Sequence, residues 1–162
     1  MTIWTRILRA VLLMAGAGVL SVVIGEALPR RWFDPQKPFW RGYAWERGGR
    51  IYRRLGVQVW KDRMPDVSRA LPSAVKKKAA LTRTADGMER LVRETCEAEF
   101  IHWALILLVS PLLPVLCGGA VGGIAAALYA AGNLVFVVIQ RYNRPRLALL
   151  LEKMKLREQR VK

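Results

Sequence analysis

The sequence predicts an all-α membrane protein, with an N-terminal transmembrane helix, a basic interfacial region and a C-terminal transmembrane or re-entrant helical hairpin. Two stretches, Ala10–Gly25 and Trp103–Gln140, contain no charged residue. Outside them, 27 Lys and Arg against 12 Asp and Glu give the chain a formal net charge of +15. Only helices or closed barrels cross a bilayer, because every backbone polar group must be paired there. This segregation excludes an ordinary soluble globule and a disordered basic tail.

The 162 residues suit one domain, which we divide into four segments. We expect an N-terminal membrane anchor over residues 1–29, a basic and aromatic-rich interfacial region over 30–83, a long helix entering a hairpin over 84–140, and a basic amphipathic tail over 141–162.

The N-terminal apolar stretch is read as an anchor. With Arg6 and Arg9 snorkelling at its start, it reaches the roughly 20 residues that a span requires. A cleaved signal peptide is the alternative, because Gly25-Glu26-Ala27 is a small-x-small site. The length of the apolar stretch and the basic region directly after it favour the anchor.

Aromatic and basic side chains alternate between Trp32 and Trp60. Trp and Tyr favour the level of the lipid headgroups, and each basic residue near an anionic surface contributes roughly 1 kcal/mol. The same mixture occurs in proteins that stack on nucleic acid. Because membrane segments lie on both sides, we expect membrane lipids and no nucleic acid as partners. Lys76-Lys77-Lys78 is interpreted as a solvated or headgroup-facing run.

The second apolar stretch is too long for one helix. We expect a helix that is capped by Thr84 or Asp86 and continues into a first arm over residues 100–117. A glycine-rich turn at Gly118–Gly123 then leads to a second arm over residues 123–140. Pro111 and Pro114 should kink or shorten the first arm. Both arms are short for a full crossing, so a re-entrant hairpin stays open.

A hairpin returns its two ends to the same side of the membrane. The flanking segments are strongly positive, and positive segments stay in the cytoplasm. We therefore expect a multi-pass protein of the plasma (inner) membrane with a cytoplasmic active face. Asn143 is expected to cap a new amphipathic helix, with Pro145 in its first turn.

The first candidate site lies where the long helix enters the membrane. Glu94, Glu99 and His102 share one helix face, together with Thr95 and Ala98. Ionisable groups at this depth are expensive and by default indicate function. We predict that His102 is a catalytic base for a hydroxyl, with Glu99 or Glu94 holding its other nitrogen.

Two other interpretations of this cluster remain. Glu-x-x-His also occurs in di-iron bundles, but these need a second such motif, and the chain has a single histidine. We expect no metal. An interfacial histidine without a catalytic role is the other alternative.

The second candidate site follows the last apolar arm. Arg141, Asn143, Arg144 and Arg146 could hold the phosphates of an acyl donor or a developing oxyanion, because guanidinium groups bind such anions bidentately. The alternative is a positive-inside stop signal with a helix cap.

These clusters carry a family resemblance. Glu94-Thr95, Ala98-Glu99 and Ile101-His102-Trp103, followed by an apolar hairpin and Gln140–Leu147, resemble the glycosyl-4,4'-diaponeurosporenoate acyltransferase family. These small membrane enzymes attach a fatty acyl chain to the sugar of a carotenoid glycoside in staphyloxanthin assembly. A weaker likeness covers Leu28-Pro29, Phe33, Trp60-Lys61 and Asp66.

The resemblance implies acyl transfer to a lipid-linked hydroxyl, with a glycolipid acceptor and an acyl-CoA or acyl-carrier donor as substrates and no cofactor. It adds Trp60 and Lys61 to the expected substrate-binding residues. Our prediction is a membrane-bound O-acyltransferase that uses a histidine base. A non-enzymatic membrane adaptor that binds anionic lipid or a protein partner is the alternative. The glycine-rich arms would also permit a homodimer.

Overall fold

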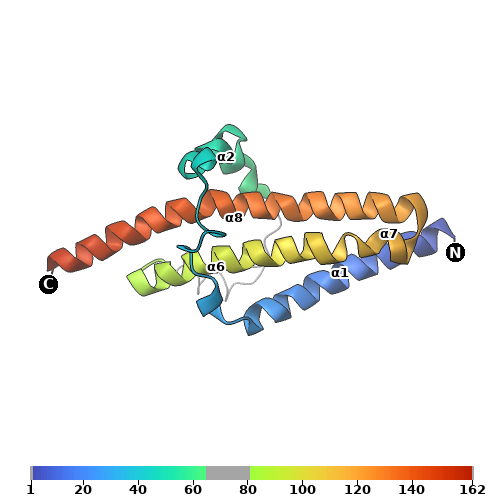
Figure 1. Ribbon diagram of the computed structural model, residues 1–162, viewed down its shortest axis with the longest axis horizontal. Coiled ribbons are helices and arrows are strands. Elements are labelled where there is room, and N and C mark those ends of the chain that lie inside the picture. Colours follow the sequence, from blue (N-terminus) through green and yellow to red (C-terminus); the bar gives the residue numbers. More distant parts are fainter. Residues whose placement is uncertain (1, 65–80, 162) are drawn as a thin grey trace. The chain divides into compact units, whose positions relative to one another are not determined.

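The computed structural model describes residues 2–64 and 81–161, and every regular element in these residues is a helix (Figure 1). The elements are α1 (Ile3–Ala27), η1 (Arg30–Trp32), η2 (Ala44–Gly49), α2 (Arg50–Arg54), α3 (Val57–Trp60), η3 (Lys61–Arg63), α6 (Ala85–Ala104), the π-helical segment η4 (Leu105–Val109), α7 (Leu112–Cys117) and α8 (Gly119–Val161). The all-α class is therefore confirmed. Asp66 and the Lys76–Lys78 run lie outside the described residues.

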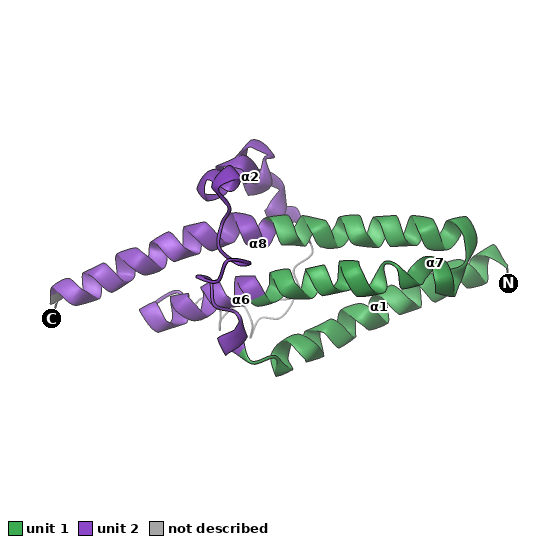
Figure 2. Cartoon of the chain, in the orientation of Figure 1, with its two compact units in different colours: residues 1–29, 97–138 green, residues 30–96, 139–162 purple. Residues whose placement is uncertain are grey.

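The chain divides into two compact units (Figure 2). We call Met1–Pro29 together with Glu97–Val138 the hairpin unit, and Arg30–Cys96 together with Ile139–Lys162 the basic unit.

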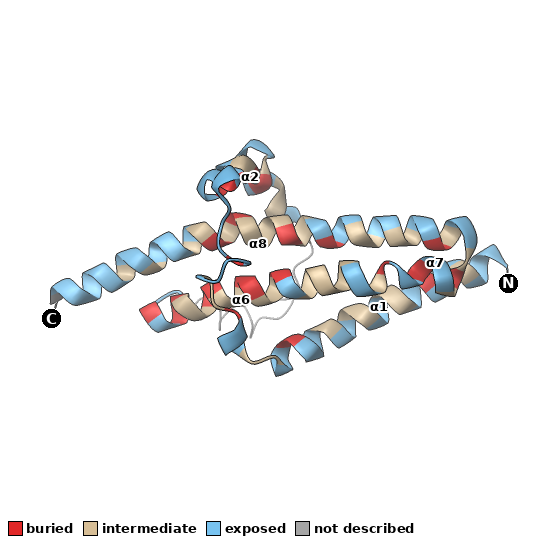
Figure 3. Ribbon diagram, viewed as in Figure 1, coloured by how far each residue is buried: buried red, intermediate tan, exposed pale blue. Residues whose placement is uncertain are grey.

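Helix α1 has the properties of the predicted anchor. Its 25 residues include a window with a mean hydropathy of 2.3, and within residues 2–64 and 81–161 α8 is the other helix that is long and apolar enough to cross a membrane. Thr2 caps α1, because its hydroxyl accepts a hydrogen bond from the Thr5 amide at 3.3 Å. Most side chains of α1 are exposed (Figure 3). An exposed face that consists of Leu and Val side chains fits lipid better than water.

Part of α1 packs on the hairpin. Ala10 is buried against Leu113 and Cys117 of α7, and Tyr129 of α8 contacts the same cluster. Helix α8 approaches α7 closely at Gly122, where an added Cβ would lie 2.6 Å from the Leu113 carbonyl oxygen. Only glycine fits there.

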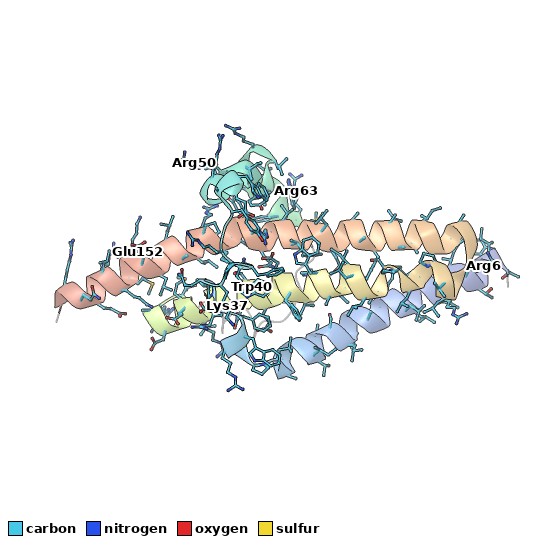
Figure 4. The ribbon with its side chains drawn as sticks, viewed as in Figure 1. Arg6, Lys37, Trp40, Arg50, Arg63 and Glu152 are labelled. Carbon is cyan, nitrogen blue, oxygen red and sulfur yellow. The ribbon has the colours of Figure 1, made fainter. Side chains whose placement is uncertain are left out.

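The hairpin turn is shorter than the sequence predicts. The left-handed backbone is confined to Gly118 (φ 73°) and Gly119 (φ 56°), and α8 already begins at Gly119. Gly122 and Gly123 therefore lie in the helix and not in the turn. Figure 4 shows Arg6 of α1 beside this turn, and its Nη1 atom would lie 3.1 Å from a Cβ at Gly119.

The prolines interrupt the first arm as expected. Pro111 has no amide hydrogen and would clash with the carbonyl four residues before it. The chain forms the wider turn η4 directly before it, in which the Ser110 amide donates to the Leu105 carbonyl at 3.3 Å. A regular helix resumes only at Leu112, so the arm is divided into α6, η4 and α7.

The start of α6 is correctly predicted. The Thr84 hydroxyl accepts a hydrogen bond from the Gly87 amide at 3.1 Å. Ala85, Met88, Leu91 and Val92 form the buried face of this first part of α6, in the basic unit. Thr84 is thus the N-cap, and Asp86 lies in the first turn.

The predicted helix break before Asn143 is wrong. Helix α8 continues through Pro145, and Asn143 is an interior residue rather than a cap. Proline in a helix removes one backbone hydrogen bond. The lost bond would join the Pro145 nitrogen to the Arg141 carbonyl, and Arg141 and Arg144, which both precede Pro145, are each held by hydrogen bonds to residues of the basic unit. These tertiary contacts offset the local loss.

Candidate active site

The imidazole of His102 is paired with a residue of α8 in the hairpin unit. Its Nδ1 atom lies 2.9 Å from the Oδ1 atom of Asn133, and the side chain of Asn133 is buried. The Asn133 amide is itself oriented, because its Nδ2 atom donates to the Tyr129 carbonyl at 2.9 Å. The carbonyl end of the amide therefore faces the ring, so Nδ1 carries the ring proton and Nε2 carries the lone pair.

A second residue of α8 fixes the plane of the ring. Phe136 stacks on His102 with the ring centroids 4.9 Å apart and an interplanar angle of 10°. Asn133 and Phe136 are three residues apart and share one helix face. One hydrogen bond and one stacked ring thus hold the imidazole in a single orientation.

Glu99 and Glu94 are the two carboxylates that we expected to assist His102. In the hairpin unit, Glu99 is fully buried and accepts a hydrogen bond from Trp103 Nε1 at 3.4 Å. In the basic unit, Glu94 accepts a hydrogen bond from Arg90 Nε at 3.1 Å and lies 3.8 Å from Arg30 Nη1. The hydrogen-bond acceptor for Nδ1 is Asn133 Oδ1, a residue that the sequence did not predict.

Arg144 joins three segments of the basic unit. Its Nε atom donates to the Thr95 hydroxyl at 2.9 Å, Nη2 donates to the Thr95 carbonyl at 3.0 Å, and Nη1 donates to the Trp40 carbonyl at 2.8 Å. The residue is only 6% exposed. All three nitrogens are engaged, which favours a structural role over the predicted contact with donor phosphates.

Arg141 forms the second anchor of this unit. Its Nη1 atom donates to the Glu46 carboxylate at 2.6 Å, and its Nη2 atom donates to the Phe39 carbonyl at 3.3 Å. Glu46 is buried and also accepts a hydrogen bond from the Tyr52 hydroxyl at 2.7 Å. Burial, together with the Glu46 carboxylate, raises the pKa of Tyr52 well above its usual value of 10. The phenol therefore stays protonated and acts as a donor to Glu46.

Two of the remaining expected binding residues, Arg146 and Lys61, contact the buried ring of Tyr142. The Arg146 guanidinium lies 5.0 Å from the ring centroid and donates to the Tyr142 hydroxyl, and Lys61 Nζ lies 5.9 Å from the same centroid. Arg146 is exposed, Lys61 is partly exposed and Asn143 is half-buried. Trp60 Nε1 donates to the Leu55 carbonyl at 3.0 Å. Arg146 and Lys61 thus lie over the same aromatic ring, and Lys61 Nζ also lies 3.6 Å from Asp62 Oδ1.

Other cations also lie on the surface of the basic unit. Figure 4 shows Arg50 of α2 and Arg63 of η3 at that surface, and both are exposed.

Arg47 adopts a left-handed backbone (φ 50°), followed by Gly48 and Gly49. This turn brings the chain back so that Tyr52 reaches Glu46.

Two central residues were missed from the sequence. Asn133 had a detectable signal, because it is the one amide side chain in the apolar arm between Gly123 and Val138, and polar groups in lipid are expensive unless they are paired. Glu46 had no such signal, because a single carboxylate among arginines is typical of a solvated surface residue.

Known proteins resemble this chain. A protein family described as glycosyl-4,4'-diaponeurosporenoate acyltransferase matches residues 29–153. The glycosyl-4,4'-diaponeurosporenoate acyltransferase of Staphylococcus aureus strain MRSA252 is 29% identical over 139 residues, which cover 85% of this chain and 82% of the relative. The proteins of the same name from strains N315 and bovine RF122 / ET3-1 are 28% identical over the same share of each chain. No solved structure matches the chain.

Proposed function

The chain belongs to the glycosyl-4,4'-diaponeurosporenoate acyltransferase family, and on that premise we propose that it moves a fatty acyl group to a hydroxyl of a lipid-linked sugar. The acceptor is a carotenoid glycoside, as the relatives' names say, or a similar glycolipid. The chain is an acyltransferase, which argues against the non-enzymatic adaptor.

His102 is the general base in this proposal. Its Nε2 lone pair accepts the proton of the sugar hydroxyl while the oxygen attacks the thioester carbonyl of the donor. The tetrahedral intermediate then collapses with cleavage of the carbon–sulfur bond. The imidazolium returns its proton to the leaving thiolate, and the products are an ester and a free thiol. No cofactor takes part in this sequence.

Asn133 is the positioning residue. By accepting from Nδ1–H, its amide keeps the tautomer in which Nε2 is free to act as a base. This is the role that we expected of Glu99 or Glu94. The predicted part of Glu99, to stabilise the imidazolium, remains a prediction.

The donor is proposed to be an acyl-CoA or an acyl carrier bound through its phosphates. Arg146, which is exposed, and Lys61, which is partly exposed and whose Nζ atom lies 3.6 Å from Asp62 Oδ1, are the candidates for that contact. Such donors are made in the cytoplasm, and the positive segments of the basic unit are expected to stay there. We therefore place the reaction at the cytoplasmic face of the plasma membrane.

The His102–Asn133 hydrogen bond is the observation that carries this proposal. Purified protein in lipid nanodiscs, incubated with labelled acyl-CoA and a glycosylated carotenoid acid, tests it. His102→Ala should reduce kcat by at least about 10²-fold, the usual contribution of a general base. Asn133→Ala should reduce kcat by about 100-fold with little change in KM.

Two comparisons separate positioning from folding. Asn133→Asp keeps an acceptor beside Nδ1 and should recover part of the kcat lost in Asn133→Ala. Leu134→Ala, the adjacent exposed position on α8, should retain wild-type kinetics. Equal transfer by wild type and His102→Ala would remove the assignment of the base, and an unaltered pH–rate profile in Asn133→Ala would remove the positioning role.

A further inference from the structure

We propose that an apolar pocket in the hairpin unit, between α1 and the segment Phe100–Val109, holds the fatty acyl chain during transfer. The pocket has a volume of about 200 Å³ and is lined by residues such as Ala17, Leu20 and Ile24 of α1 and Phe100, Ala104 and Leu108 across from them. This inference rests on the proposed function, because it assigns a place to one part of the substrate.

The pocket lies between two close contacts of α1 with the first arm of the hairpin, and α1 also packs on η4 along the pocket wall. At one end, a Cβ on Gly25 would lie 2.7 Å from Ile101 Cδ1, so the backbone of α1 is in close contact with α6. At the other end, Ala10 is buried against Leu113 and Cys117. Between these contacts the small side chains of Ala17 and Ala104 leave the space unfilled.

The wide turn η4 contributes to the same space. Leu105, Leu108 and Val109 belong both to this π-helical segment and to the pocket lining. A π-helical turn changes the direction of the side chains that follow it, and such turns occur frequently at functional sites. Here Pro111 imposes the turn, and the turn shapes the pocket wall.

The polarity of the lining restricts the occupant to a hydrocarbon. Ser21 is its one polar side chain, and the Ser21 hydroxyl donates to the Gly18 carbonyl at 2.7 Å on its own helix. A sugar or a phosphate would lose its water here and find no partner, at a cost of several kcal/mol. An alkyl chain makes no hydrogen bonds to water and therefore loses none when it enters the pocket.

The location of the pocket favours the acyl chain over the hydrocarbon part of the acceptor. Its lining begins at Phe100 and Ile101, directly before the base His102, and extends about 14 Å along the helix to Val109. A thioester carbonyl at the level of His102 would therefore place its alkyl chain in the pocket. The volume is only slightly larger than the roughly 150 Å³ cavity that holds one benzene. A segment of one flexible chain fits such a space better than a long rigid polyene.

Chain-length selectivity tests this placement. Wild-type protein and the variants Ala17→Trp and Ala104→Phe receive saturated acyl-CoA donors of increasing length with a fixed acceptor. Filling the pocket should lower the ratio of kcat/KM for long over short donors by at least about tenfold, the effect of a few methylene contacts. Ala15→Trp and Ala131→Phe, at exposed positions outside the lining, are the matched controls and should keep the wild-type ratio.

A crosslinking experiment makes the test independent of catalysis. His102→Ala protein in nanodiscs is irradiated with an acyl-CoA that carries a diazirine on its alkyl chain, and the adducts are mapped by mass spectrometry. Adducts on residues 17–28 and 100–109, which Ala17→Trp reduces, would support the pocket even if His102 proved not to be the base. Adducts elsewhere, the same adducts from a diazirine phosphatidylcholine, or unchanged chain-length profiles in both filled variants would overturn it.

Discussion

Arg144 illustrates how a membrane-adjacent arginine can be committed to folding rather than to binding. Its guanidinium group makes a fork of hydrogen bonds to the carbonyl and the hydroxyl of Thr95, and its third nitrogen reaches the Trp40 carbonyl. The same guanidinium lies 5.8 Å from the centroid of the Trp40 ring. A planar fork with five donors can satisfy this geometry, whereas the ammonium group of lysine cannot.

This geometry makes Arg144→Lys a destabilising substitution despite the retained charge. Loss of two buried hydrogen bonds from a charged group should cost about 3 kcal/mol of unfolding free energy. Thermal unfolding in detergent should show a lower Tm, while the KM for the acyl donor in the surviving protein stays unchanged. The exposed Arg146→Gln should do the reverse, with a wild-type Tm and a raised donor KM. A normal Tm with a raised donor KM in Arg144→Lys would restore the substrate contact expected from the sequence.

Among the elements, the α7–α8 turn depends on one residue. Gly118 combines φ 73° with ψ 152°, a backbone conformation that side chains other than hydrogen rarely allow. The turn lets α8 reverse direction and bring Asn133 to the same unit as His102. The backbone at residue 118 therefore determines which residue of α8 lies beside the imidazole of His102.

Gly118→Ala should destabilise the protein by about 1–3 kcal/mol and lower acyl transfer. Gly123→Ala is the matched control, because that position is inside α8 and a Cβ there meets no atom within 4 Å. It should leave Tm unchanged or slightly raised, as alanine favours a helix. Chemical denaturation monitored by Trp fluorescence measures both, and equal stability of the two variants would contradict the role of the turn.

A pH-dependent contact joins α6 to the C-terminal part of α8 in the basic unit. Lys155 Nζ donates to Glu89 at 2.9 Å and Arg93 donates to the same carboxylate at 3.1 Å. The hydrogen bond from Lys155, followed by that from Arg93, lowers the pKa of Glu89. A lowered pKa stabilises the fold at pH values above the ordinary glutamate value, and this contribution is lost as the pH falls through the lower folded value.

We therefore expect the tail to loosen only at pH values below the ordinary pKa of a glutamate. Limited proteolysis after residue 150 should be slow at pH 7 and should accelerate in acid with a pepsin-type protease. In Glu89→Gln the cleavage rate should already be raised at neutral pH and should depend less on acidity. Identical pH profiles of wild type and Glu89→Gln would contradict this assignment. The partners are partly exposed, so the effect on global stability should be small.

At the scale of the whole molecule, charge and hydropathy are separated along the chain. The +15 net charge lies outside two apolar stretches, and each stretch overlaps one of the two helices in the described residues that are long and apolar enough to span. The positive-inside rule then predicts the orientation. The N-terminus should be outside, and both the 30–64 segment and the tail should be in the cytoplasm.

Cysteine labelling in intact cells checks this orientation. The native Cys96 and Cys117 are buried, so they should give little background with a membrane-impermeant maleimide. Thr2→Cys should react from outside, whereas Arg63→Cys and Gln159→Cys should react only after the membrane is permeabilised. External labelling of Arg63→Cys would reverse the topology, and protection of Thr2→Cys would show that α1 does not cross fully.

The sequence predicts those features that depend on local chemistry. The Thr84 cap, the interruption before Pro111 and the apolar character of α1 all follow from neighbouring residues. The exact turn at Gly118 does not, because four glycines in Gly118–Gly123 offer several equivalent positions. Packing of Gly122 on Leu113 selects among them.

The site was less predictable because its partners are distant in sequence. Asn133 is 31 residues from His102 and Glu46 is 95 from Arg141. Periodicity identifies which residues share a helix face, and it therefore identified Glu99 beside His102, but it cannot select a partner on another helix. Pro145 shows the same limit, because local rules predict a helix start where long-range hydrogen bonds keep α8 continuous.

An amide, and not a carboxylate, lies beside the imidazole, and this affects how the contact responds to changes in pH and in membrane potential. The Asn133 side chain has no titratable proton and carries no net charge, so neither acid nor a voltage across the lipid acts on it directly. The orientation that Asn133 gives to the neutral ring should therefore stay the same when the proton gradient of the cell collapses or recovers.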